Sequence, residues 1–209
     1  MSRTSSNTAS EGQRAWQRML SGRRLDLLDP SPLDVELDDI AHGLARVARW
    51  NGQTYGDHAL SVAQHSLVVE QVLMHLRPSA SAQSQLYALL HDAPEYVIGD
   101  MISPFKAVMG GAYKSVEARL QAAVHIRFGL PAEPSSELSR LIKKADRITA
   151  WFEATELAGF TVEEADRFFV RPSGLSIKDI PLHAMTTAQA QAAFASRVAE
   201  VEDRIAGGP

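Results

Sequence analysis

The feature that most restricts the fold of this chain is the spacing of its apolar residues, which recur every three or four positions over most of its length. Along the stretch 58–76, apolar residues share one helical face with a histidine: His65, Val68, Val69, Val72 and Leu76. No segment alternates apolar and polar residues between hairpin turns, as a half-buried strand would. The pattern therefore predicts an all-α fold.

Proline and glycine breaks divide this pattern into roughly seven helices of one bundle-like domain. We expect helices at 34–49, 58–76, 79–92, 113–128, 136–157 and 187–205, with shorter ones at 12–28 and 162–169. Asp57 and Ser79 are expected to cap the second and third of these. A length of 209 residues, of which 45% are hydrophobic, fits one helical domain over residues 14–209, behind a flexible Ser- and Thr-rich tail at 1–13.

Charge and composition exclude several classes of function. A net charge of −4 argues against a protein that binds nucleic-acid polymers or anionic membranes, since both need an excess of Lys and Arg. The chain has no cysteine, which excludes disulfides and thiolate metal sites. It shows neither the apolar core of a secretory signal nor an apolar run long enough to span a bilayer. We expect a cytoplasmic protein with no membrane partner.

Four residues on three predicted helices could hold a metal ion. His65 points inward with its apolar face, the pair His91-Asp92 ends an apolar helix, and Asp146 shares a face with apolar Ile142. A buried carboxylate without a partner is costly, and coordination of a cation removes that cost. Taken singly, each residue could instead be a hydrogen-bonded core histidine or a capping aspartate. Their combination favours a metal site.

The predicted ligand set is two histidines and two aspartates, which suits a single divalent cation: Mn, Co, Fe, Ni, Zn or Mg. Such a set leaves positions open for water and substrate, and it favours hydrolysis over redox chemistry. Glu153 lies seven residues after Asp146 on the same face and could accept a hydrogen bond from a ligand histidine, although we assign it no role here. Asp57 and His58 could line a pocket, but capping is preferred for Asp57.

The order of these residues resembles the H…HD…D signature of the HD-domain superfamily, with His91 26 residues after His65 and Asp146 54 residues after Asp92. The likeness is greatest to the bacterial 5′-deoxynucleotidases of that superfamily, and it extends from about residue 40 to residue 157. It is carried by Arg49-Trp50 before the first ligand helix, and by the segments 91–95, 99–100 and 104–106.

This resemblance implies a metal-dependent phosphohydrolase acting on a small-molecule nucleotide, in the first place a 5′-deoxynucleotidase that converts a dNMP to a deoxynucleoside and phosphate. It implies metal ligation by His65, His91, Asp92 and Asp146. It further implies that Glu95 positions or activates the attacking water and that Asp100 is a second acidic residue near the substrate. Contacts to the phosphate, sugar or base are implied for Arg49, Trp50 and Lys106.

Several alternatives stay open. The loop 51–56 and the extensions at both ends depart from the nucleotidase pattern, so the substrate could be a deoxynucleoside monophosphate, a dNTP cleaved by a triphosphohydrolase, or another phosphomonoester. An alternative of another class is a non-catalytic helical regulatory protein stabilised by its metal. The predicted last helix carries apolar residues that could form either core or a homodimer interface: Ala192, Phe194, Val198 and Val201.

Overall fold

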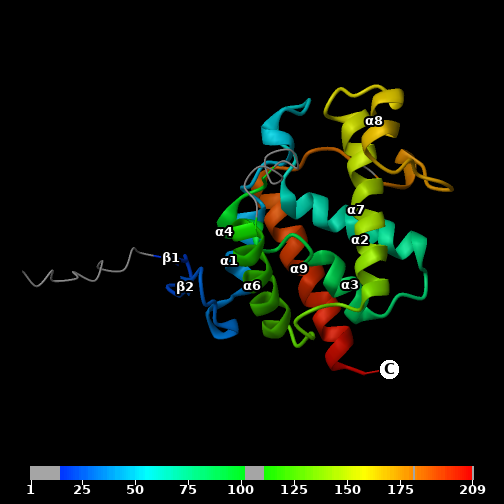
Figure 1. The fold of residues 1–209 in the computed structure, drawn as a ribbon. Coiled ribbons are helices and arrows are strands. Elements are labelled where there is room, and N and C mark those ends of the chain that lie inside the picture. The colour runs from blue at the N-terminus through cyan, green and yellow to red at the C-terminus, as the bar shows by residue number, and fades with distance from the viewer. Residues whose placement is uncertain (1–14, 102–110, 181, 209) are drawn as a thin grey trace, which may run out of the picture.

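The computed structural model describes residues 15–101, 111–180 and 182–208, and it is mostly helical, as predicted (Figure 1). Its α-helices are α1 (Leu37–Leu44), α2 (Val62–Leu76), α3 (Ala82–Leu89), α4 (Glu95–Ile98), α6 (Gly111–Arg127), α7 (Ser136–Glu156), α8 (Val162–Phe168) and α9 (Thr187–Ala206). Short 3-10 helices lie at Pro32–Asp34, Arg49–Gly52 and Ile177–Asp179. The all-α fold class is confirmed.

Helix α2 lies at the centre of the packing, where it contacts α3, α7 and α9. Val69, Val72 and Leu73 of α2 are fully buried in the core. Helix α1 packs on α4 and α9, and α8 packs on α7. The stretch with the clearest helical spacing thus forms a helix that is surrounded by others, which is where an inward-facing histidine would be enclosed.

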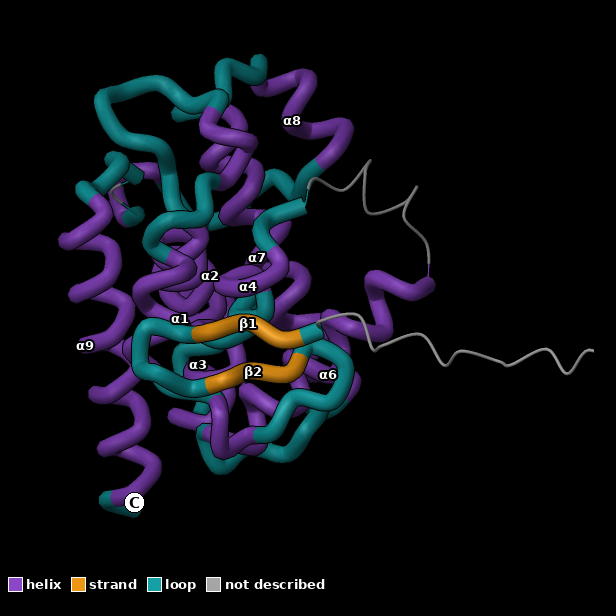
Figure 2. The backbone as a smooth tube through the Cα atoms, turned by 90° about the vertical axis from the view of Figure 1, so that its left-hand side faces the viewer, coloured by secondary structure: helices purple, strands orange, loops and turns teal. Residues whose placement is uncertain are grey.

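The prediction of a helix at 12–28 is wrong over the described residues. Strands β1 (Trp16–Arg18) and β2 (Arg24–Asp26) form a small antiparallel hairpin, in which Gln17 pairs with Leu25. Figure 2 shows the two strands side by side on one flank of the helical body. Each strand has only three residues, and in β2 Leu25 is fully buried while its two neighbours are not. So short a segment shows no alternation of apolar and polar residues by which a strand could be predicted from the sequence.

Two predicted helix starts are also corrected. Helix α2 begins at Val62, and its N-cap is Ser61, whose hydroxyl accepts the backbone N–H of Gln64; Asp57 does not cap it. Helix α3 is capped in the same way by Ser81 rather than Ser79. Serine and aspartate are both good caps, so local composition alone could not decide which residue precedes the first turn.

The last helix packs into the core with most of its apolar residues. Phe194, Val198 and Val201 are fully buried in the same core as α2, whereas Ala192 is exposed. Arg197 on α9 also donates to the buried carboxylate of Glu70 on α2 at 2.7 Å. The buried residues of this stripe are therefore core residues. Among the described residues, no helix is long and apolar enough to cross a bilayer.

Candidate metal centre

Helix packing brings three of the predicted metal ligands together from separate parts of the chain. His65 lies on α2, His91 on the turn that follows α3, and Asp146 on α7. One potential ligand atom of each lies within 4.8 Å of those of the other two. His65 Nε2 is 3.2 Å from Asp146 Oδ1. Residues 26 and 55 positions apart in the sequence thus form one cluster.

Asp92 lies beside this cluster, between the two imidazoles. Its Oδ2 is 3.2 Å from His91 Nε2 and 3.6 Å from His65 Nε2. The set of mutually close ligand atoms comprises the two histidines and Asp146 without it. The structure therefore places all four predicted ligands at one site, with Asp92 facing both histidines.

Both histidines are oriented by a partner on the ring nitrogen that faces away from the cluster. His65 Nδ1 is 2.6 Å from Oε1 of Glu153, and His91 Nδ1 is 2.8 Å from the carbonyl oxygen of Ala88. A carboxylate and a carbonyl can only accept, so each Nδ1 carries a proton, and Nε2 is the nitrogen that presents a lone pair when the ring is neutral. Neither Nε2 makes a well-aligned hydrogen bond within the described residues, although both are buried.

The charges around the cluster keep its carboxylates ionised. Burial raises the pKa of Asp92, but His91, His65 and Arg49 outweigh burial and hold that pKa well below its usual range. The pKa of Asp146 is likewise lowered, since contact with His65 and the charges of both histidines exceed the effect of burial. Burial and Arg49 lower the pKa of His65, yet Glu153 and Asp146 raise it to about 9. The site therefore attracts positive charge, whether a proton or a metal ion.

The donor atoms fit a divalent cation. Two imidazole nitrogens, each of which presents a lone pair once a metal ion displaces the proton, and two carboxylates are the borderline nitrogen and oxygen set expected for a first-row transition metal or magnesium. The side chains of Asp92 and Asp146 are 24% and 35% exposed, so solvent reaches one side of the cluster. A site that is open on one side leaves room for a water molecule and a substrate.

Glu153 orients His65, which is the role that the sequence suggested for it without allowing it to be assigned. It is completely buried on α7, and its carboxylate accepts from three side chains: His65 Nδ1, Arg49 Nε at 3.1 Å and Trp50 Nε1 at 3.0 Å. Burial raises its pKa, but Arg49 and His65 outweigh burial and lower it to about 2. Its seven-residue spacing from Asp146 was the available signal, since both then lie on one face of α7.

Arg49 lies beside the cluster. Its Nη1 is 3.8 Å from Asp92 Oδ2, and its side chain is only 13% exposed. Burial lowers its pKa, but Glu153, Asp92, Asp100 and Asp146 together raise it, so the guanidinium stays charged. A charged guanidinium with terminal N–H groups beside a metal cluster can bind a phosphate through two oxygens.

The segment that carries Arg49 has an unusual backbone. Trp50 and Asn51 both have positive φ, 57° and 51°, which is uncommon for residues with a side chain. The indole of Trp50 packs edge-on against Phe160 and Phe169, with ring centroids 5.6 and 5.7 Å away. These contacts and the bond to Glu153 offset the strain at Trp50. They also show that the indole is engaged with protein groups; its contact with a substrate stays a prediction.

The predicted acidic residues follow the HD pair closely. Glu95 begins α4 and is buried, and its backbone N–H bonds to the carbonyl of Asp92 at 3.0 Å, so the chain turns tightly across Pro94. Helix α4 lies close to α1: a Cβ added to Gly43 of α1 would be only 2.7 Å from the Cβ of Tyr96 on α4. Asp100 is half-buried and close enough to affect Arg49. Lys106 lies outside the described residues.

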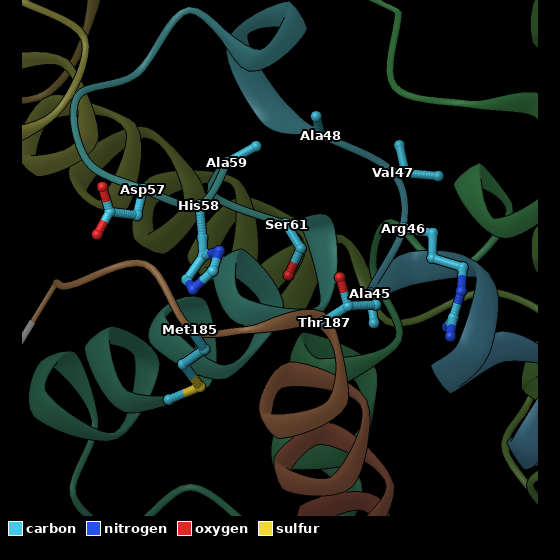
Figure 3. A pocket seen from close by; sticks show the side chains of 10 residues that line it. All are labelled: Ala45, Arg46, Val47, Ala48, Asp57, His58, Ala59, Ser61, Met185 and Thr187. Carbon is cyan, nitrogen blue, oxygen red and sulfur yellow. The ribbon is translucent and has the colours of Figure 1, made fainter.

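A pocket of about 290 Å³ is lined by residues outside the metal cluster (Figure 3). It is lined by the segment that precedes Arg49, by Asp57 and His58, and by Met185 and Thr187 at the start of the last helix. None of the predicted metal ligands lines it. Asp57 and His58 thus line a pocket, but one that lacks the metal cluster.

Comparison with known proteins gives a family. Residues 39–164 match the family described as 5′-deoxynucleotidase YfbR-like, and this range includes the four predicted ligands together with Arg49 and Glu153. A protein of Rhodobacter capsulatus that is named as uncharacterised is 54% identical over 185 residues, which cover 88% of this chain and 94% of that protein. With well over half of its length matched, the chain belongs to the YfbR-like 5′-deoxynucleotidase family of the HD superfamily.

Proposed function

We propose that the protein is a metal-dependent 5′-deoxynucleotidase, which hydrolyses a deoxynucleoside 5′-monophosphate to a deoxynucleoside and phosphate. The observation that carries the proposal is the position of the Arg49 guanidinium beside a cluster of two buried imidazole Nε2 atoms, which make no hydrogen bond within the described residues, and two ionised carboxylates. A cation site next to a phosphate receptor is what hydrolysis of a phosphoester requires. Membership of the family supports both the hydrolytic reaction and the divalent metal.

The residues that would hold the metal are His65 and His91, each through Nε2, together with Asp92 and Asp146. When bound, a divalent cation polarises a phosphoryl oxygen and lowers the pKa of water towards neutrality. The orientation of both imidazoles is set before any ion arrives, because Glu153 and the carbonyl of Ala88 hold their Nδ1–H groups.

The remaining residues bind the phosphate and move the proton. Arg49 donates its terminal N–H groups to two phosphate oxygens, which fixes the phosphorus over the cluster and offsets the charge that grows on those oxygens. Glu95 accepts the proton of the attacking water as the new P–O bond forms. The bond from phosphorus to the 5′ oxygen then breaks, and that oxygen takes up the proton that Glu95 accepted from the water, so that the deoxynucleoside leaves as the neutral alcohol and Glu95 is again a carboxylate. Asp100 is the second acid near the substrate.

A catalytic role fits the exposure of the cluster better than a purely structural one. A structural metal site is closed by protein ligands on all sides. Here Asp146 is one-third exposed, and a charged arginine that no structural site would need lies next to Asp92. This supports a hydrolase over the non-catalytic regulatory protein.

The test is a product assay on the purified protein with a panel of deoxynucleotides and ribonucleotides, in the presence of Mn²⁺, Co²⁺ or Mg²⁺. Orthophosphate released from deoxynucleoside monophosphates is the expected result. Tripolyphosphate released from dNTPs would identify a triphosphohydrolase instead, and metal binding without any hydrolysis would favour the regulatory alternative. Asp146→Ala should abolish activity, whereas Asp203→Ala, an exposed aspartate on α9, should not.

A further inference from the structure

The buried carboxylate of Glu153 connects two parts of the site that have different tasks. Its Oε1 accepts from His65 Nδ1 at 2.6 Å, and its Oε2 accepts from Arg49 Nε at 3.1 Å. These partners come from α2 and from the segment before it, while Glu153 lies on α7, 88 and 104 residues away from them. We propose that Glu153 is a positioning residue that couples metal binding at His65 to phosphate binding at Arg49.

The contact with His65 sets the direction of the metal-binding nitrogen. Because Nδ1–H donates to Glu153, the lone pair of Nε2 points towards His91, Asp92 and Asp146. A carboxylate on the far side of an imidazole also makes the ring a stronger donor to a cation. Loss of this contact would let the imidazole ring of His65 turn or take the other tautomer, and either change weakens the binding of a metal ion.

The contact with Arg49 leaves the two terminal nitrogens of the guanidinium for the phosphate. The guanidinium donates its Nε–H to Glu153 Oε2, and its Nη1 lies 3.8 Å from Asp92 Oδ2. The same oxygen accepts from Trp50 Nε1, which ties down the positive-φ backbone next to Arg49. Glu153 thus holds both the arginine and the segment that carries it.

One anion serves both partners, so disturbing it should affect both kinds of binding at once. Glu153 has no solvent contact that could replace a lost partner. An amide at this position keeps the shape, but it has only one oxygen and must present N–H groups to one set of donors. The phosphate half of the inference rests on the proposed function, whereas the metal half does not.

The experiment is calorimetric titration of the full-length, chelator-treated protein with Co²⁺, followed by titration of the Co²⁺-loaded protein with inorganic phosphate. Glu153→Gln should weaken Co²⁺ binding by about 10- to 100-fold, the usual effect of losing such an orienting partner, and should weaken phosphate binding as well. Glu156→Gln is the matched control, because it makes the same change on the exposed side of α7 and should alter neither. Arg49→Lys should cost less phosphate affinity in the Glu153→Gln background than in the wild type.

A lower melting temperature for Glu153→Gln with unchanged Co²⁺ affinity would overturn the inference, since that is what a purely structural residue gives. If Co²⁺-loaded wild-type protein bound no phosphate, the proposed link between Glu153 and phosphate binding at Arg49 would be overturned. Should Glu153→Gln not fold, Glu153→Asp takes its place: a side chain about 1.5 Å shorter keeps the charge but cannot reach both sets of donors, so the same losses are expected. Turnover is not needed for these readouts, so absent nucleotidase activity would refute the proposed function alone.

Discussion

Replacing Gly43 by alanine tests whether the close approach of α1 and α4 positions the predicted base. Glycine inside a helix is normally less favourable than alanine by about 0.5–1 kcal/mol, so the local effect of Gly43→Ala is stabilising. In this fold, however, the new Cβ would lie 2.7 Å from the Cβ of Tyr96, 2.8 Å from its carbonyl oxygen and 3.0 Å from its Cα. Two of these are backbone atoms, which cannot turn aside as a side chain would.

Ordinary carbon contacts lie at about 3.5–4.0 Å, so α4 must move away from α1 by roughly 1 Å. Overpacking of this kind costs about 1–3 kcal/mol, which exceeds the helix gain. We expect a net destabilisation of about 1–2 kcal/mol, or a melting temperature lowered by about 2–8 °C for a chain of this size. Because Glu95 begins α4, a shift of that size should also reduce kcat by about 100-fold.

Thermal unfolding and steady-state phosphate release, with metal content measured in parallel, decide the outcome. Gly207→Ala at the end of α9 is the control, since its added Cβ meets only a carbonyl at 3.3 Å, and it should change little. A Gly43→Ala protein that melts higher than the wild type and keeps its kcat would show that the α1–α4 contact is not rigid. The α1–α4 contact would then not be what positions Glu95.

Three further perturbations have outcomes set by the same structure. Asp146→Ala should remove the stabilisation of the fold by metal, which amounts to about 2.7 kcal/mol when Mn²⁺ is present at 100 times its Kd. Differential scanning fluorimetry with and without chelator measures this loss, and a variant that Mn²⁺ still stabilises would contradict the assignment of Asp146 as a ligand. Arg197→Met should destabilise the fold by about 3 kcal/mol in urea unfolding, because it leaves the buried Glu70 without its cation. Glu200→Gln removes the exposed partner of the same arginine and should have almost no effect. The folded-state pKa of Glu153 is about 2 instead of its ordinary 4.5, so the stability that its charge contributes to the metal-free protein is complete above pH 4.5 and is lost as the pH falls towards 2. The urea midpoint should therefore decline more steeply from about pH 7 to about pH 3 in the wild type than in Glu153→Gln. Parallel declines in the two proteins would contradict the lowered pKa of Glu153.

Much of the fold could be predicted from the sequence because helical periodicity is a local property. The apolar face shared by His65, Val68 and Val72 lies on one side of α2, and the interior of the bundle encloses it. Order along the chain also indicated that His91, Asp92 and Asp146 would meet His65, as they do. The hairpin at 16–26 was missed because its two strands are three residues each and only Leu25 is fully buried.

Helix starts were harder to predict than helices. Asp57 and Ser61 are both suitable N-caps, and the choice depends on where the chain leaves its antiparallel bridge between Ala48 and Ser61. The backbone of Trp50 and Asn51 was equally hidden, since nothing in their identity requires a positive φ. Packing on Phe160 and Phe169 and the bond to Glu153 compensate for that conformation, and all three partners lie more than 100 residues away.

The sequence alone determined the helical class and the inward face of α2, because helical spacing acts over a few positions, and it named the residues that gather at the candidate metal centre. Only the tertiary structure decided how those residues are oriented. The proton on His65 Nδ1 and the direction of the Arg49 fork depend on a carboxylate contributed by a different helix. A hydrogen-bond partner is chosen by the packing of distant segments, and no local pattern records that choice.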